Sequence, residues 1–203
     1  MFDARLRPLI DPPLNAMGRA LVRLGVTANQ ATVAGALLGA AAGAAISQGW
    51  YAAGLGLILA SRLLDGLDGA IARASRPTDF GGYLDILADY VFYIAVPVGF
   101  GLADRANLPA ALILVGAFNL TAVSFLGFAS IAARRGLETS AHGLKAFFYS
   151  TGLAEGAETI FAFVLACLWP AGFPVIALAF AGLCGLTVIQ RTVIAVETFR
   201  NEP

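Results

Sequence analysis

Residues 65–90 read DGLDGAIARASRPTDFGGYLDILADY, and they decide the fold because they place acidic side chains at the ends of two apolar segments. On a helix, the acidic and small residues of the first half share one face: Asp65, Asp68, Gly69 and Ala72. Those of the second half share another face: Gly81, Asp85 and Asp89. Two antiparallel helices joined by a short loop around Pro77 would bring the four carboxylates together at the same depth.

Four unpaired anions at one depth of a membrane would repel one another, and burying even one ionised carboxylate without a partner is costly. Acid pairs at helix ends are commonly caps or solvated residues, but two pairs with small residues between them favour a metal site. Mg²⁺ or Mn²⁺ prefers carboxylate oxygens and accepts water and phosphate as further ligands. The absence of Cys or His nearby argues against zinc. We therefore predict a site for two divalent ions, with four ligands: Asp65, Asp68, Asp85 and Asp89.

The regions on both sides of this stretch predict an all-α membrane protein. Of the 203 residues, 59% are hydrophobic and 13% are charged, and the mean hydropathy is +0.79, outside the range of soluble domains. Six apolar segments are long enough to be transmembrane helices: residues 30–48, 50–72, 81–103, 108–132, 146–169 and 173–196. Residues 1–25 alternate charged and apolar residues, which predicts an amphipathic helix on the membrane surface. We expect one domain over residues 1–203, with the six-helix bundle at residues 30–196.

The basic residues predict the orientation in the membrane. All but one of those that flank the spans fall in one set of loops and termini: Arg5, Arg7, Arg19, Arg23, Arg73, Arg76, Arg134, Arg135, Lys145 and Arg200. The opposite set contains Arg105. By the positive-inside rule, both termini and the aspartate site are then cytoplasmic, in a protein integral to the cell (inner) membrane. The net charge of zero favours no nucleic-acid partner.

The aspartate stretch resembles the signature of the CDP-alcohol phosphotransferase (CDP-alcohol phosphatidyltransferase) family. The matching residues are Asp65-x-x-Asp68-Gly69-x-x-Ala72-Arg73 and Gly81-x-x-x-Asp85-x-x-x-Asp89, and the connection between Arg73 and Gly81 is one residue shorter than is usual in the family. The run Ala28-Asn29-Gln30-Ala31-Thr32 resembles the segment before the family's first span.

This resemblance implies a homodimeric transferase of phospholipid biosynthesis that uses CDP-diacylglycerol. An alcohol hydroxyl would attack the lipid-side phosphorus, a phosphatidyl group would move to the alcohol, and CMP would leave. Asp89 would serve both as a metal ligand and as the catalytic base. The residues around the CDP group would be Asn29, Thr32, Asp65, Gly69, Ala72, Arg73 and Gly81.

Two further acids, Glu155 and Glu158, interrupt the fifth apolar segment, and acids within a membrane are candidates for function. They could instead form a structural pair with Lys145 or Arg191. We assign these four residues to the acceptor site as a hypothesis. Carboxylates there would favour an uncharged or cationic alcohol over a phosphorylated one.

A different class of protein, a divalent-cation transporter or sensor, could also use an aspartate cluster as an ion site. The small residues at positions 69, 72 and 81 and the cation Arg73 favour the enzyme. An ion path needs neither a nucleotide-sized recess nor a cation beside the metal.

Overall fold

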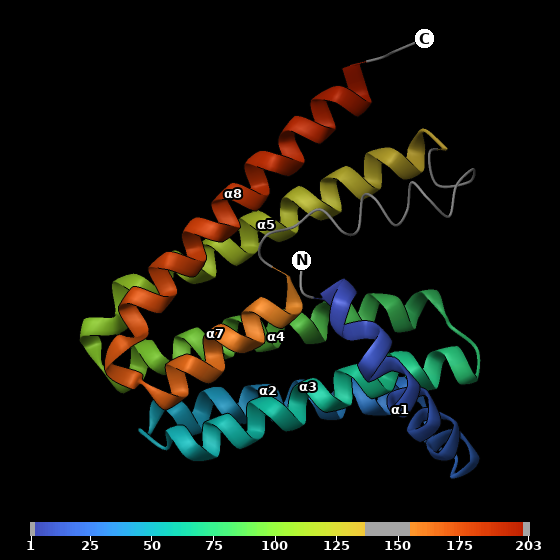
Figure 1. Ribbon diagram of the computed structural model, residues 1–203, viewed down its shortest axis with the longest axis horizontal. Coiled ribbons are helices and arrows are strands. Elements are labelled where there is room, and N and C mark those ends of the chain that lie inside the picture. The colour runs from blue at the N-terminus through green and yellow to red at the C-terminus, as the bar shows by residue number, and fades with distance from the viewer. Residues whose placement is uncertain (1–2, 137–154, 201–203) are drawn as a thin grey trace.

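The computed structural model describes residues 3–136 and 155–200, and within these ranges the secondary structure is helical, without strands. The elements are α1 (Asp3–Arg23), α2 (Ala28–Ser47), α3 (Tyr51–Ala74), α4 (Asp79–Ala103), η1 (Arg105–Asn107), α5 (Leu108–Arg134), α7 (Gly156–Leu168), η2 (Pro170–Gly172) and α8 (Phe173–Arg200) (Figure 1). The predicted all-α class is confirmed.

Four of the helical segments are long and apolar enough to cross a membrane: Ala28–Ser47, Asp79–Ala103, Arg105–Arg134 and Pro170–Arg200. The protein is therefore an integral membrane protein. Helix α3 is long enough at 24 residues, but it carries the charged residues of the aspartate stretch. The described part of the fifth predicted segment is α7, which has 13 residues, and the rest of that segment lies outside the described ranges. The prediction of six transmembrane spans is thus not confirmed.

Short polar caps fix where α2 and α4 begin. The Thr27 hydroxyl accepts a hydrogen bond from the backbone N–H of Gln30, and the Gln30 side chain accepts one from the Thr27 N–H. This reciprocal pair satisfies two N–H groups that a helix leaves unpaired at its first turn. Thr78 caps α4 in a similar way by accepting from the N–H of Gly81. Helix α3 ends at Ala74 and α4 begins at Asp79, so the connection that contains Pro77 is short, as the sequence predicts. The residue before a proline is disfavoured in the helical conformation, which is consistent with a helix that ends before Pro77.

Helix α2 packs against both α3 and α4, and small residues allow the close approach. A Cβ atom added to Gly43 would collide with the carbonyl of Ala95, and one added to Gly99 would collide with the carbonyl of Gly43. Close backbone packing of this kind is how helices associate in lipid, where apolar burial offers little drive. It fixes α4 against α2 and sets the depth of the acids on α4.

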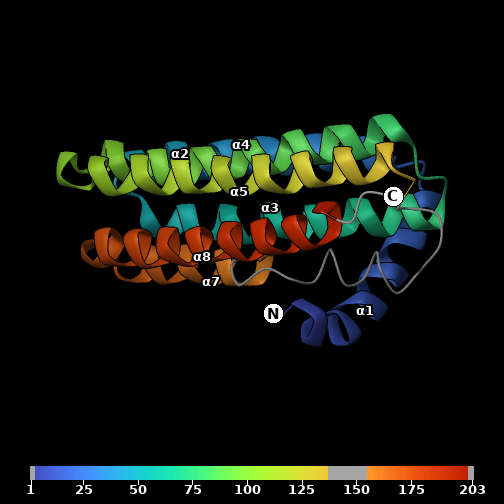
Figure 2. The same ribbon diagram turned by 90° about the horizontal axis from the view of Figure 1, so that it is seen from above.

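The elements farther along the chain complete the bundle around an aromatic core. Helices α5 and α8 pack against each other, and α7 lies against α3 and α8 (Figures 1 and 2). Rings of Phe92, Phe118, Phe163 and Phe180 contact one another where α4, α5, α7 and α8 meet. This core also includes Ala42 and Ile46 of α2, and a Cβ at Gly39 would lie 3.2 Å from Phe92, so the core extends from α2 through α4 to the later helices.

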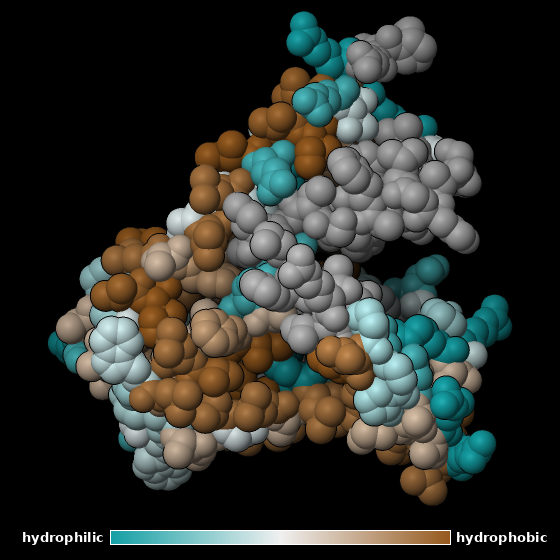
Figure 3. All heavy atoms as spheres, in the orientation of Figure 1, coloured by the Kyte–Doolittle hydropathy of each residue, from teal (hydrophilic) through white to brown (hydrophobic). Residues whose placement is uncertain are grey.

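Helix α1 crosses the end of the bundle near the α3–α4 connection (Figures 1 and 2). A Cβ added to Gly18 would lie 2.8 Å from the backbone carbon of Ala70, so α1 touches α3 beside the aspartate stretch. Hydrophilic side chains gather at this end of the molecule, and a broad hydrophobic surface covers much of the remaining face in view (Figure 3). The site therefore lies at the polar end of an otherwise apolar bundle.

The α2–α4 contact predicts a stability difference between two glycines. Replacing Gly43 by Leu should lower the free energy of unfolding by about 1–3 kcal/mol or more, because the two backbones must separate. Gly56 on α3 has open space where a Cβ would be, so Gly56→Leu is the matched control and should have little effect. Thermal unfolding in detergent measures both, and equal midpoints for the two variants would contradict the proposed role of the close packing.

A three-carboxylate cluster between two cavities

Three of the four predicted aspartates converge. Carboxylate oxygens of Asp65 and Asp68 on α3 and of Asp85 on α4 all lie within 4.8 Å of one another. Ligands around an octahedral Mg²⁺ at about 2.1 Å are separated by roughly 3–4 Å, so this spacing suits a divalent ion with little adjustment. The donor set fits as well, since carboxylate oxygens are the ligands that Mg²⁺ and Mn²⁺ prefer.

A hydroxyl from a third helix orients the most buried of these acids. Asp68 is 6% exposed, and its Oδ2 accepts a hydrogen bond of 2.6 Å from the Thr32 hydroxyl on α2. The same hydroxyl lies 3.0 Å from the carbonyl of Ala28. Because one hydroxyl has one proton, Thr32 donates to one of these oxygens at a time. The hydrogen bond fixes one oxygen of Asp68 against α2, which leaves the other oxygen for a ligand.

The fourth aspartate, Asp89, is paired with an arginine. Nη1 of Arg62 donates to Oδ1 of Asp89 at 2.7 Å and lies 3.3 Å from Oδ1 of Asp65. The Arg62 side chain is 9% exposed, whereas those of Asp65 and Asp89 are about one third exposed. Charge-assisted hydrogen bonds of this length are among the stronger ones in proteins. Asp89 and Asp65 thus share one guanidinium, which places Asp89 beside the three converging acids.

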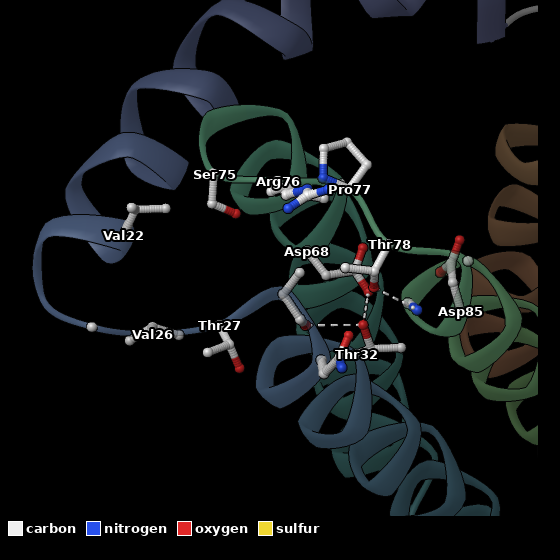
Figure 4. A pocket seen from close by; sticks show the side chains of 17 residues that line it. Val22, Val26, Thr27, Thr32, Asp68, Ser75, Arg76, Pro77, Thr78 and Asp85 are labelled. Atoms are coloured by element: carbon white, nitrogen blue, oxygen red, sulfur yellow. Dashed lines mark hydrogen bonds between the residues drawn. The ribbon is translucent and has the colours of Figure 1, made fainter.

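A cavity of about 530 Å³ opens beside the cluster, between α1, α2 and the α3–α4 connection (Figure 4). Asp68 and Asp85 reach it from α3 and α4. Several residues that the sequence assigned to the CDP group line it as well: Asn29, Thr32, Gly69, Ala72 and Gly81. The glycines keep it open, since a Cβ at Gly81 would lie 3.0 Å from the Thr78 hydroxyl and 3.2 Å from Oδ1 of Asn29.

Arg73, also assigned to the CDP group, is not among the residues that line this cavity. Its Nε and Nη2 donate to Oδ1 of Asn15 on α1, at 3.3 and 3.0 Å. Its Nη1 lies 3.2 Å from where a Cβ of Gly69 would be. The guanidinium is therefore held by α1 at the rim of the cavity, next to Gly69.

A second cavity, of about 340 Å³, lies between α4, α5, α7 and α8. Asp89 lines it, together with Glu155 and Arg191, two residues of the predicted acceptor site. Arg191 is anchored there, since its Nη1 donates to the carbonyl of Thr121 at 3.1 Å and its guanidinium lies 5.4 Å from the ring centre of Phe125.

The other two predicted acceptor residues are not placed in this cavity. Glu158 lies on α7 one turn beyond Glu155 and is not among the lining residues. Lys145 lies outside the described residues.

The sequence reasoning missed Arg62, Arg76, Thr78 and Asn15. Arg62 had a detectable signal, because it lies three residues before Asp65 within an apolar segment and i, i+3 side chains on a helix are neighbours. Arg76 and Thr78 line the first cavity from the α3–α4 connection. Asn15 carried no signal, since its partner Arg73 is far away in sequence and on another helix.

Comparison with known proteins places the chain in a family. Residues 25–194 match the CDP-alcohol phosphatidyltransferase family. The chain is 45% identical over 192 residues to the inner membrane protein YnjF of Escherichia coli (strain K12), covering 94% of this chain and 93% of the relative. It is 32% identical over 197 residues to the archaetidylinositol phosphate synthase of Pyrococcus horikoshii, covering 93% of each chain.

Solved structures share the fold. The phosphatidylinositol phosphate synthase PgsA1 of Mycobacterium tuberculosis, in its complex with CDP-DAG, superposes with a TM-score of 0.67 at 24% identity, covering 90% of this chain and 93% of that chain. Its complex with manganese and citrate gives a TM-score of 0.68, with 90% and 88% covered. The family match over most of the chain confirms the resemblance seen in residues 65–90, and the protein is an enzyme that belongs to the CDP-alcohol phosphatidyltransferase family.

Proposed function

We propose that this protein transfers a phosphatidyl group from CDP-diacylglycerol to a polar alcohol, with release of CMP, at the cytoplasmic face of the inner membrane. One observation carries the proposal: two cavities flank the same group of acids, with Asp68 and Asp85 lining the first and Asp89 lining the second. A group transfer between two substrates needs two such sites that meet at the reacting atoms. The rival class, a cation transporter or sensor, does not account for the first cavity's volume or its Gly-rich wall.

The first cavity is the proposed CDP site. Its lining combines backbone exposed at Gly69 and Gly81 with hydroxyl and amide groups from Thr32 and Asn29. These groups can hydrogen-bond a nucleotide, and Arg76 and the nearby Arg73 supply positive charge for the diphosphate. The structure of PgsA1 was solved with CDP-DAG bound, which supports the donor assigned here.

The three converging acids are the proposed metal site, and Asp89 is proposed as a further ligand and as the base. Divalent ions held there would neutralise the diphosphate and stabilise the charge that develops during transfer. Asp89 takes the proton from the acceptor hydroxyl. The hydroxyl oxygen then bonds to the lipid-side phosphorus, the bond from that phosphorus to the bridging oxygen breaks, and CMP leaves with the electron pair.

The second cavity is the proposed acceptor site. Its described charged groups are two carboxylates, Asp89 and Glu155, and one guanidinium, Arg191. This mixture favours a neutral polyol or a cationic alcohol, whose hydroxyls can both donate and accept hydrogen bonds. The relatives named archaetidylinositol phosphate synthase and phosphatidylinositol phosphate synthase make a phosphorylated polyol the alternative to be compared in the assay.

The arrangement in the membrane is also part of the proposal. The site opens at the end of the bundle where α1 and the α3–α4 connection lie, and the basic residues there predict a cytoplasmic location. Helix α1 exposes Leu9, Ile10 and Met17, and Leu24 just after it is exposed as well, which suits a helix lying on the membrane surface. We propose that residues 1–203 form one domain with six spans, that both termini are cytoplasmic, and that the protein works as a homodimer.

The direct test is an assay of CMP release. Purified protein in detergent or lipid nanodiscs with Mg²⁺ or Mn²⁺ should release CMP from CDP-diacylglycerol when the correct alcohol is added. The panel should include glycerol 3-phosphate, inositol, inositol phosphate, serine and ethanolamine. Release with none of a broad panel of alcohols and both metals would contradict the proposed reaction.

The metal assignment predicts a difference between aspartates. Asp68→Asn and Asp85→Asn should each weaken Mn²⁺ binding by at least about tenfold, since each removes a charged oxygen ligand from the cluster. Asp104→Asn is the matched control, because Asp104 caps η1 and asparagine can also cap. Calorimetry with Mn²⁺ measures all three variants, and unchanged affinity in both cluster variants would rule out the cluster as the metal site.

If each cavity binds one substrate, a variant in each cavity should raise the KM of that substrate alone. Gly69→Leu should raise the KM for CDP-diacylglycerol by about tenfold or more with little effect on the acceptor KM, because the side chain fills the first cavity. Glu155→Gln should raise the acceptor KM and spare that of the CDP-lipid. The bundle should tolerate the leucine, since the atom closest to a Cβ at Gly69 is the end of the flexible Arg73 side chain. If both variants changed the same KM, the assignment of separate donor and acceptor cavities would be wrong.

A further inference from the structure

Helix α1 borders the first cavity, and the proposed reaction gives this helix no role. Val22, near the C-terminal end of α1, lines that cavity together with Asp68 and Gly69 of α3 (Figure 4). A helix that served only to hold the protein at the membrane surface would not need to reach a binding site. The contacts of α1 with α3 therefore need a further explanation.

Two close contacts fix α1 on one face of α3. A Cβ added to Gly18 of α1 would lie 2.8 Å from the backbone carbon of Ala70. A Cβ added to Gly66 of α3 would lie 2.9 Å from Cδ1 of Leu14. On each helix the two contacting residues are four apart, so they lie on the same face. Close packing at both points leaves the two helices little freedom to slide or rotate against each other.

Asn15 lies on α1 between these two contacts, and its side chain binds Arg73 of α3. Oδ1 of Asn15 accepts hydrogen bonds from Nε at 3.3 Å and from Nη2 at 3.0 Å. These two nitrogens form one edge of the planar guanidinium, so a single oxygen restrains the direction of the whole group. Nη1 lies 3.2 Å from where a Cβ of Gly69 would be, and Gly69 lines the first cavity. Asn15 thus directs Nη1 toward the rim of that cavity.

The chemistry of an amide suits this role, because it restrains the arginine without neutralising it. Asn15 is half-buried, whereas Arg73 is exposed. An exposed arginine without a partner samples many rotamers, and ordering it on binding a ligand costs free energy. A carboxylate at position 15 would hold the guanidinium more strongly but would also cancel its charge. The amide oxygen leaves the positive charge of Arg73 available for an anion at the cavity.

We propose that Asn15 is a positioning residue of the donor site, which holds the Arg73 guanidinium at the rim of the first cavity so that it binds a phosphate of the CDP group. The inference rests on the proposed function, which assigns this cavity to CDP. It makes α1 part of the donor site as well as a helix at the membrane surface. A contact that only fastened α1 to α3 would have a different signature, because its loss would weaken CDP binding whether or not an arginine stood at position 73.

The test is a double-mutant cycle in the full-length protein, with the binding of CDP in the presence of Mn²⁺ measured by calorimetry. Asn15→Ala should raise the Kd for CDP by about tenfold, because Arg73 must then be ordered when the ligand binds. In an Arg73→Met background, Asn15→Ala should change the Kd by less than about twofold, because no guanidinium is left to position. A parental Kd in Asn15→Ala, or equal effects of Asn15→Ala in the two backgrounds, would overturn the proposal.

Kinetics and a control variant complete the experiment. Asn15→Ala should raise the KM for CDP-diacylglycerol by about tenfold and leave the acceptor KM and kcat near those of the parent, because the second cavity and the proposed base are unchanged. Met17→Ala removes an exposed side chain from the same helix and should change none of these quantities. If Asn15→Ala does not fold, Asn15→Ser decides through the same cycle, since its shorter hydroxyl does not reach both nitrogens of Arg73.

The role of Asn15 and the proposed function fail differently. A parent protein that binds CDP but releases no CMP with any alcohol would reject the proposed reaction, and the binding cycle would still decide the role of Asn15. A parent that releases CMP but shows no coupling between Asn15 and Arg73 would reject the role of Asn15 alone. A parent that binds no CDP would overturn both.

Discussion

The structure depends on placing several carboxylates together at the end of an apolar bundle. Asp65, Asp68 and Asp85 lie close enough for strong mutual repulsion in a medium that screens charge poorly. The described structure meets this cost in two ways, through the Thr32 hydroxyl on Asp68 and the Arg62 guanidinium between Asp65 and Asp89. A divalent ion would balance the remaining negative charge. Without these partners, the repulsion between the carboxylates would destabilise the bundle.

Close helix packing makes this concentration of charge possible. The contacts of Gly43 with α4 and of Gly18 with α3 bring the backbones near enough for side chains from three helices to reach the cluster. Packing of this kind is rigid, because a backbone pressed against a backbone has no rotamers through which to adjust. The carboxylates consequently keep fixed positions, which is what a metal site and a group transfer both require.

Helix α4 has a special position because it belongs to both cavities. Asp85 reaches the first cavity, and Asp89, one turn later, reaches the second. A helix presents residues four apart on nearly the same face, so the two acids diverge only slightly and meet the two cavities near their common border. A short helical step thus connects the proposed CDP site to the proposed acceptor site. The four-residue spacing of Asp85 and Asp89 is what lets one helix supply an acid to each cavity, so the spacing of these acids matters to the proposed reaction as much as their number.

The sequence by itself determined the helical membrane class, the family and the acids that share helix faces, because helical periodicity and hydropathy are local properties of the chain. It also predicted roles for Asn29, Gly69 and Glu155, and the structure places the first two at the first cavity and Glu155 at the second. Only the tertiary structure decided that Arg62 lies between Asp65 and Asp89, that Arg73 is held by Asn15, and that oxygens of Asp65, Asp68 and Asp85 lie within 4.8 Å of one another. The physical reason is that these relations depend on how each helix is rotated about its axis and how deeply it is set against its neighbours. Those quantities are fixed by close contacts between residues far apart in the chain, such as Gly43 with Ala95, and a periodic pattern along one helix does not contain them.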